Sequence, residues 1–179
     1  MALRKASSYS KRYTRPYTRK SKVKKKAYIK TIPPTKVVKL RMGDLAGYRD
    51  GKYPIILDIA TKHQVQLRDN AIEAARQYLQ RFLEEGIGKE YYFELMVYPH
   101  HIMRENKMLT GAGADRMQTG MSQSFGSAIG RAALVKEGQI IFRICVLNEK
   151  HEAQTRELIR SVRPRLPCTV SIITTRRKK

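Results

Sequence analysis

The stretch 103–131 holds the side chains best suited to bind a ligand. Arg104, Lys107 and Arg116 could each pair with a phosphate, and Asn106 and Gln118 could bond to base edges or sugar hydroxyls. The stretch shows no period of apolar residues, and compact domains rarely carry structureless loops of this length unless the loop has a function. The sequence therefore predicts a nucleic-acid-binding loop.

A metal site at the start of this loop is a more specific alternative. His100 and His101 are followed by Glu105. Adjacent histidines point to opposite sides of a strand, and no His-x-x-x-His spacing exists. We expect one imidazole to pack and the other to meet a phosphate or a backbone group, with no metal and no other cofactor.

Catalysis receives no more support than metal binding. Gly111-Ala-Gly113 is similar to a nucleotide-binding turn, but the third glycine and the strand-to-helix setting are missing. No nucleophile has a paired base. We expect Glu105 and Asp115 to offset neighbouring arginines, and the chain not to be an enzyme.

The charge of the chain points to a polyanionic partner. Its 37 Lys and Arg against 15 Asp and Glu give a net charge of +22. A compact domain with this charge repels itself, and phosphate backbones supply the compensation. No apolar run approaches the length of a membrane span and no lipidation signal is present, so we expect no membrane partner.

Both ends of the chain are basic. The first acidic residue is Asp44, and none follows Glu157. Residues 1–30 carry too few aliphatics to build a core, and their tyrosines alternate with basic residues, so that rings could stack on bases while cations hold phosphate. A solvated tail is the plain alternative. A transit peptide is disfavoured because no apolar face recurs and Pro16 interrupts the stretch.

The charge pattern and the resemblance described below together give one set of candidate rRNA-binding residues: Arg4, Lys5, Arg12, Tyr13, Arg15, Tyr17, Arg19, Lys20, Lys24, Lys25, Lys26, Arg41, His101, Arg131, Arg176 and Arg177.

The middle of the chain alternates between strand and helix patterns. Strands are predicted over 37–42, 55–60, 91–98, 132–135, 139–147 and 169–175. A helix is predicted from about Ala71 to Glu85, capped by Asn70 and ended by Gly86. A second is predicted over 149–162, capped by Asn148 and ended by Pro164. In 91–98, Tyr91, Phe93, Leu95 and Val97 should share one face and Tyr92, Glu94, Met96 and Tyr98 the other. Cys145 and Cys168 are expected to be buried small hydrophobes.

Strands and helices do not alternate strictly, so the predicted class is α+β, with a mostly antiparallel sheet and two packed helices. We expect a basic extension over 1–34, one domain over 35–175 with the loop 103–131, and a basic tail over 176–179.

Several motifs are similar to those of one known family. They are His101-Ile-Met-Arg104, Asn106-Lys-Met-Leu109, Ala112-Gly-Ala-Asp-Arg-Met-Gln-Thr-Gly-Met121, Arg15-Pro-Tyr-Thr-Arg19, Asn70-Ala-Ile-Glu-Ala-Ala-Arg76 and Gly138-Gln-Ile-Ile141. Together they cover most of the chain and resemble the archaeal and eukaryotic large-subunit ribosomal protein family L10e, whose bacterial counterpart is L16p.

The resemblance implies an α/β-hammerhead-like domain on large-subunit rRNA near the central protuberance of a cytoplasmic ribosome. It implies contacts with other large-subunit proteins, no homo-oligomer, and a loop that reaches the peptidyl-transferase centre and the tRNA acceptor end. The loop residues it implies are Arg104, Asn106, Lys107, Met108, Gly111, Gly113, Asp115, Arg116, Gln118 and Thr119.

Two departures from the family pattern are visible. Residues 122–128 lack two positive charges that the family usually carries, and Tyr98 stands where histidine is common. Two other functions stay open from the residues alone. One is a chromatin-type packaging protein, which the basic ends would suit, and the other is an RNA-processing enzyme.

Overall fold

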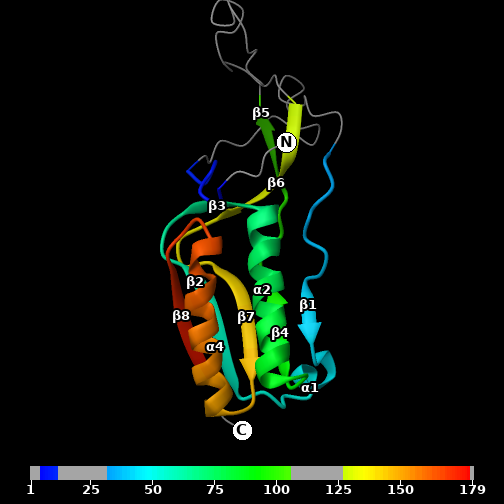
Figure 1. Ribbon diagram of the computed structural model, residues 1–179, viewed down its shortest axis with the longest axis vertical. Helices are drawn as coiled ribbons and strands as arrows, with labels where there is room; N and C mark the ends of the chain where they lie inside the picture. The colour runs from blue at the N-terminus through cyan, green and yellow to red at the C-terminus, as the bar shows by residue number, and fades with distance from the viewer. Residues whose placement is uncertain (1–4, 12–31, 106–126, 178–179) are drawn as a thin grey trace, which may run out of the picture.

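The computed structural model describes residues 5–11, 32–105 and 127–177 (Figure 1). These residues form a five-stranded sheet in the order β1-β4-β7-β2-β8 and a three-stranded sheet in the order β3-β6-β5. Every strand pair is antiparallel. The predicted α+β class is therefore confirmed.

The five-stranded sheet carries the two long helices on one face. Its strands are β1 (Arg41–Gly43), β4 (Tyr91–Leu95), β7 (Ile140–Val146), β2 (Ile55–Thr61) and β8 (Val170–Arg176). Helices α2 (Asp69–Ile87) and α4 (Glu149–Val162) lie side by side in front of it in Figure 1. The short helix η2 (Arg163–Arg165) follows α4.

The main core lies between this sheet and the helices. The predicted alternation in β4 is confirmed, since Tyr91, Phe93 and Leu95 all point into this core. Tyr92 points to the opposite face but is also buried, in a smaller cluster with Tyr53, Ile56 and Cys145. Helix α1 (Leu45–Arg49) partly covers that second cluster, because Leu45 and Tyr48 pack against it. Cys145 is buried as expected, and Cys168 is partly buried.

The three-stranded sheet corrects the prediction of one long loop. Strand β5 (His101–Glu105) and strand β6 (Ser127–Val135) occupy both ends of the stretch predicted to be irregular. β6 pairs with β5 along one edge and with β3 (Val65–Arg68) along the other. The two strands of the hairpin become more exposed toward residues 105 and 127. They extend beyond the helices in Figure 1.

The ends of α2 differ from the prediction. The helix begins at Asp69, so Asn70 lies inside it and Arg68 occupies the cap position without a side-chain hydrogen bond. The Asp69 carboxylate instead accepts a hydrogen bond from the Asn70 N–H. Gly86 also lies inside the helix. Its role as a stop passes to Gly88, whose φ of 76° is the left-handed conformation that glycine adopts without strain.

Helix α4 has the predicted bounds, although Asn148 caps it without a side-chain hydrogen bond, and Pro164 lies in η2. The strand predicted over 37–42 is shorter, since β1 begins only at Arg41. The helix α1 was not predicted, because Gly47 and Gly51 suggested a loop. A Cβ at Gly47 would lie 2.3 Å from an Asp44 carboxylate oxygen, so a larger residue there would displace the carboxylate that caps α1.

Candidate nucleic-acid interface

The outer ends of β5 and β6 are where the predicted loop joins the folded domain. Of the predicted loop residues, the structure describes Arg104, in β5 next to Glu105. His101 is buried in the same strand, with 8% of its surface exposed. His100 is exposed, and its Nδ1 lies 3.1 Å from the Tyr98 carbonyl. One imidazole of the pair packs and the other meets a backbone group, as the sequence suggested.

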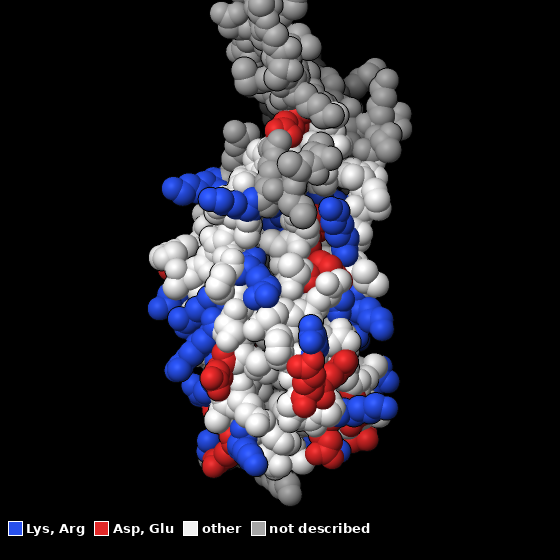
Figure 2. Space-filling view, viewed as in Figure 1, with Lys and Arg blue, Asp and Glu red and all other residues white. Residues whose placement is uncertain are grey.

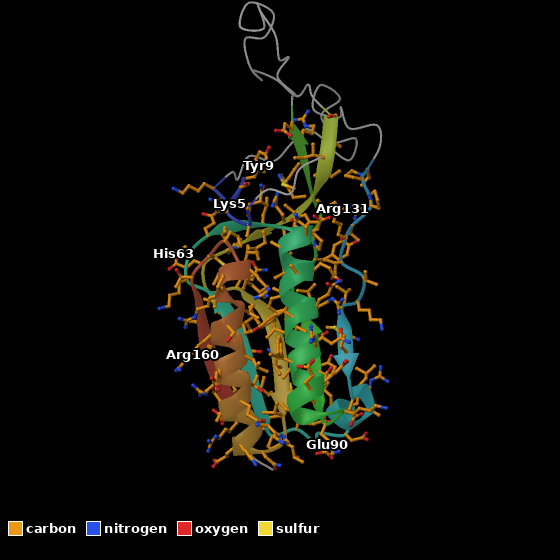
Figure 3. All side chains as sticks on the ribbon, viewed as in Figure 1. Lys5, Tyr9, His63, Glu90, Arg131 and Arg160 are labelled. Atoms are coloured by element: carbon orange, nitrogen blue, oxygen red, sulfur yellow. The ribbon has the colours of Figure 1, made fainter. Side chains whose placement is uncertain are left out.

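The segment 5–11 docks against β3 beside this hairpin. The Gln66 side chain and its backbone N–H donate hydrogen bonds to the carbonyls of Tyr9 and Ser10, both at 2.9 Å. Arg68 donates to the Lys5 carbonyl at 3.0 Å. The Tyr9 hydroxyl donates to Glu105 at 2.8 Å. The basic N-terminal end is thus bonded to the strand from which the predicted loop departs (Figure 3).

Arg131 fastens a second segment to the hairpin. Its Nε donates to the Pro33 carbonyl at 2.7 Å and its guanidinium donates to the Tyr98 hydroxyl at 3.1 Å. Tyr98, which departs from the family pattern, therefore serves as an acceptor for a predicted RNA-binding arginine. Nearby, the Lys36 and Val38 N–H groups donate to Asp69 and Glu73 on α2.

Arg41 ends a row of side chains across the face of the five-stranded sheet opposite the helices. The strand register places Arg41, Glu94, Arg143, Asp58 and Ile173 directly opposite one another. Positive and negative groups alternate over four strands, with Arg41 2.7 Å from Glu94 and Arg143 2.8 Å from Asp58. These hydrogen bonds to carboxylates raise the pKa of Arg41 and of Arg143.

The basic residues near the C-terminus also have partners within the domain. Arg176 lies 3.0 Å from Glu149 and 3.5 Å from Glu152. The Arg177 guanidinium lies over the Tyr48 ring, 5.4 Å from its centre, and that ring stacks on Tyr92 with 4.0 Å between centroids. Such contacts hold each cation in place but leave less of it available to phosphate.

The remaining predicted residues lie outside the described residues. These are Arg4, Arg12, Tyr13, Arg15, Tyr17, Arg19, Lys20, Lys24, Lys25, Lys26, Asn106, Lys107, Met108, Gly111, Gly113, Asp115, Arg116, Gln118 and Thr119.

Among the described residues, no group of three His, Cys, Asp or Glu side chains could hold a metal ion. Within the same ranges, none of the helices has the length and apolar character to cross a membrane. Burial raises the pKa of the Cys145 thiol to about 12 and that of Cys168 to about 11. Both thiols are therefore protonated at neutral pH and are poor nucleophiles.

Comparison with known proteins gives a family match over most of the chain. A model of the family described as ribosomal protein L16p/L10e matches residues 14–173. The chain is 39% identical over 174 residues to the large ribosomal subunit protein uL16 of Staphylothermus marinus, covering 97% of this chain and 94% of the relative. The uL16 of Hyperthermus butylicus is 40% identical over 168 residues, with coverages of 90% and 87%. That of Methanococcus maripaludis is 39% identical over 180 residues, with coverages of 100% and 98%.

Proposed function

Because the chain belongs to the ribosomal protein L16p/L10e family, we propose that it is a structural constituent of the large ribosomal subunit. It binds large-subunit rRNA near the central protuberance, contacts other large-subunit proteins and works in the cytoplasm as a single copy per subunit. It performs no catalysis itself. The observation that carries this proposal is the family match over residues 14–173.

The geometry supports a division of work between the ends of the domain. The β5–β6 hairpin leaves the body at the point where the basic segment 5–11 is docked (Figure 1). In the proposal, the basic N-terminal end binds rRNA. The loop between the two strands extends toward the peptidyl-transferase centre and the tRNA acceptor end, where it supports tRNA placement and subunit maturation.

Sedimentation of gently lysed cells tests the first part of this proposal. The protein should co-sediment with large subunits through moderate salt and protect rRNA. Recovery only in the soluble pool would rule the proposal out. Equal affinity of the purified protein for duplex DNA and for rRNA at matched salt would instead favour a chromatin-type role.

Deletion of Gly111 to Asp115 tests the role of the loop. These residues are glycine, alanine and aspartate, which have little apolar surface to bury, so the variant should keep the stability of the parent chain. Subunits that contain it should show impaired tRNA binding and peptide synthesis. Normal tRNA binding and normal synthesis by such subunits would refute the tRNA role and leave the rRNA-binding role standing.

A further inference from the structure

Basic side chains lie along the C-terminal half of α4 and on the segments beside it, a surface here called the α4 flank. Its members are Lys62, His63, Arg160, Arg163 and Arg165. The β2–β3 turn is fixed to the segment between η2 and β8, because the Lys62 N–H donates to the Thr169 carbonyl at 3.0 Å. Figure 3 labels His63 and Arg160 along this side, and Figure 2 shows Lys and Arg atoms along it.

The fold places the Lys and Arg side chains of the α4 flank on the solvent-exposed side of the domain. Ile159 and Val162 are each only 1% exposed and pack in the main core, so the residues that alternate with them on the helix face solvent. All five members of the α4 flank are exposed. The Arg165 guanidinium lies over the Tyr78 ring, 3.8 Å from its centre, which holds this cation at the rim of the surface.

These cations differ in their partners from four other arginines of the domain. Arg41, Arg143, Arg156 and Arg176 each lie within ion-pair distance of a carboxylate. Within residues 5–11, 32–105 and 127–177, no carboxylate forms an ion pair with Lys62, Arg160 or Arg163. The acidic residues of α4, Glu149, Glu152 and Glu157, all precede Arg160, although Lys150 and Arg156 lie among them.

Helix stabilisation alone does not account for this surface. Cations near a helix C-terminus interact favourably with the helix dipole, but the effect is confined to the last turn. That covers Arg160 but not Lys62, which lies on a turn between strands. Gathering Lys and Arg side chains on one surface costs repulsion, and within the described residues Lys62, Arg160 and Arg163 form no ion pair that offsets it.

We propose that the α4 flank binds the phosphate backbone of an RNA helix. This inference rests on the proposed function and adds a folded anchor to the basic N-terminal end. Arg160 and Arg163 are one helical turn apart, a spacing at which side chains are neighbours and could contact successive phosphates. Contacts of this kind fix position and orientation without reading sequence. The expected ligand is therefore duplex rRNA of any sequence.

The test compares two triple variants of the full chain that lose equal charge. One is Lys62→Gln/Arg160→Gln/Arg163→Gln. The control is Arg49→Gln/Lys52→Gln/Lys89→Gln, in and near α1 at the other end of the domain, where Figure 3 labels Glu90. All six residues are exposed. Thermal melts followed by circular dichroism establish that both variants fold.

Binding to a short RNA duplex and to deproteinised large-subunit rRNA is measured over a range of salt concentrations. The flank variant should bind about tenfold more weakly near 0.1 M salt, and the slope of log affinity against log salt should fall by roughly 2 to 3. The control variant should lose less affinity, and its slope of log affinity against log salt should fall by less. Equal losses in the two variants would overturn the proposal, because the flank would then contribute only general charge.

A protein partner for the α4 flank is the competing outcome. If the flank variant binds RNA like the parent chain but fails to enter large subunits in cells, the flank contacts protein and the proposal is wrong. Failure of the parent chain itself to bind rRNA or to co-sediment with subunits would contradict the proposed function instead. The two failures are therefore distinguishable.

Discussion

In the five-stranded sheet, the side chains that face α2 and α4 are almost all buried and apolar, whereas the three-stranded sheet leaves the main core as it approaches residues 105 and 127. Its outer part is held by polar contacts from distant segments: Tyr9 to Glu105, and Arg131 to Pro33 and Tyr98. The comparison separates a part of the molecule that supplies stability from a part that presents the candidate interface.

Truncating one buried apolar side chain in each sheet tests whether the two sheets differ in their contribution to stability. Phe142 is fully buried in the main core, with its ring 5.6 Å from that of Phe93. Phe142→Ala should lower the free energy of unfolding by about 3–5 kcal/mol, through lost burial and a cavity. Urea denaturation followed by circular dichroism measures it.

Ile102→Ala is the matched change in the three-stranded sheet. Ile102 is 5% exposed but lies in β5, outside the main core cluster. Its loss should fall near the low end of the range for such truncations, about 2 kcal/mol. If Ile102→Ala costs as much as Phe142→Ala, the outer part of the three-stranded sheet contributes to stability as strongly as the main core, and the proposed separation fails.

A smaller effect is expected from the charged row on the open face of the five-stranded sheet. Asp58→Ala leaves the Arg143 guanidinium, whose side chain is 25% exposed, without its two carboxylate acceptors. Hydrogen bonds to charged groups contribute about 1.5–3 kcal/mol, so a loss of about 2 kcal/mol is expected by urea denaturation.

Two further variants test whether the loss of stability in Asp58→Ala comes from the unpaired Arg143 charge. Asp58→Ala/Arg143→Met should recover part of the loss, because no unpaired charge then remains. Glu85→Ala, which breaks the exposed pair with Arg81, should leave stability unchanged. A loss for Glu85→Ala as large as that for Asp58→Ala would show that the row has no special role.

The same contrast explains what the sequence could predict. Helix α4 and the alternation in β4 are local patterns, and both are confirmed. Strand β3 was missed because it runs directly into α2 with no turn residue between them. Its partner β6 lies far along the chain.

At the candidate interface too, the sequence indicated residues but not their partners from distant parts of the chain. Arg131 was among the predicted RNA-binding residues, but its acceptor, the Pro33 carbonyl, is 98 residues away. The cations of the α4 flank could be counted in the sequence. What separates them from the paired arginines is the position of carboxylates in the folded chain.

Glu73 lies where the two regions meet, and it gives a pH dependence. Burial alone would raise the pKa of its carboxyl, but hydrogen bonds from Arg76, Gln77 and the Val38 N–H outweigh burial and hold the pKa below its usual range. A lowered pKa in the folded state means that this stabilisation is present above the unfolded pKa of about 4.3 and is lost as pH falls through the folded value.

Glu73→Gln should therefore lower stability by about 1–2 kcal/mol at pH 7, and the difference from the parent chain should shrink at pH 3. Urea denaturation at several pH values measures it. Glu137→Gln, on an exposed turn, removes equal charge without touching the Arg76 network. A Glu73→Gln deficit that is constant with pH would contradict the ionic origin of this contact.

The smallest change is expected from Tyr9→Phe, and it addresses the three-stranded sheet alone. The variant removes the hydroxyl that donates to Glu105 and keeps the ring, which should cost about 0.5–1.5 kcal/mol. Because segment 5–11 is fastened to the two edge strands of this sheet, β3 and β5, the cost should appear as local opening rather than as global unfolding. Hydrogen exchange at the Gln66 amide, which bonds to the Ser10 carbonyl, should become faster. Exchange at Ile144 in β7 should stay unchanged, since β7 belongs to the other sheet. If Ile144 is accelerated equally, the N-terminal segment stabilises the whole domain, and the docking of the basic end cannot be treated as separate from the core.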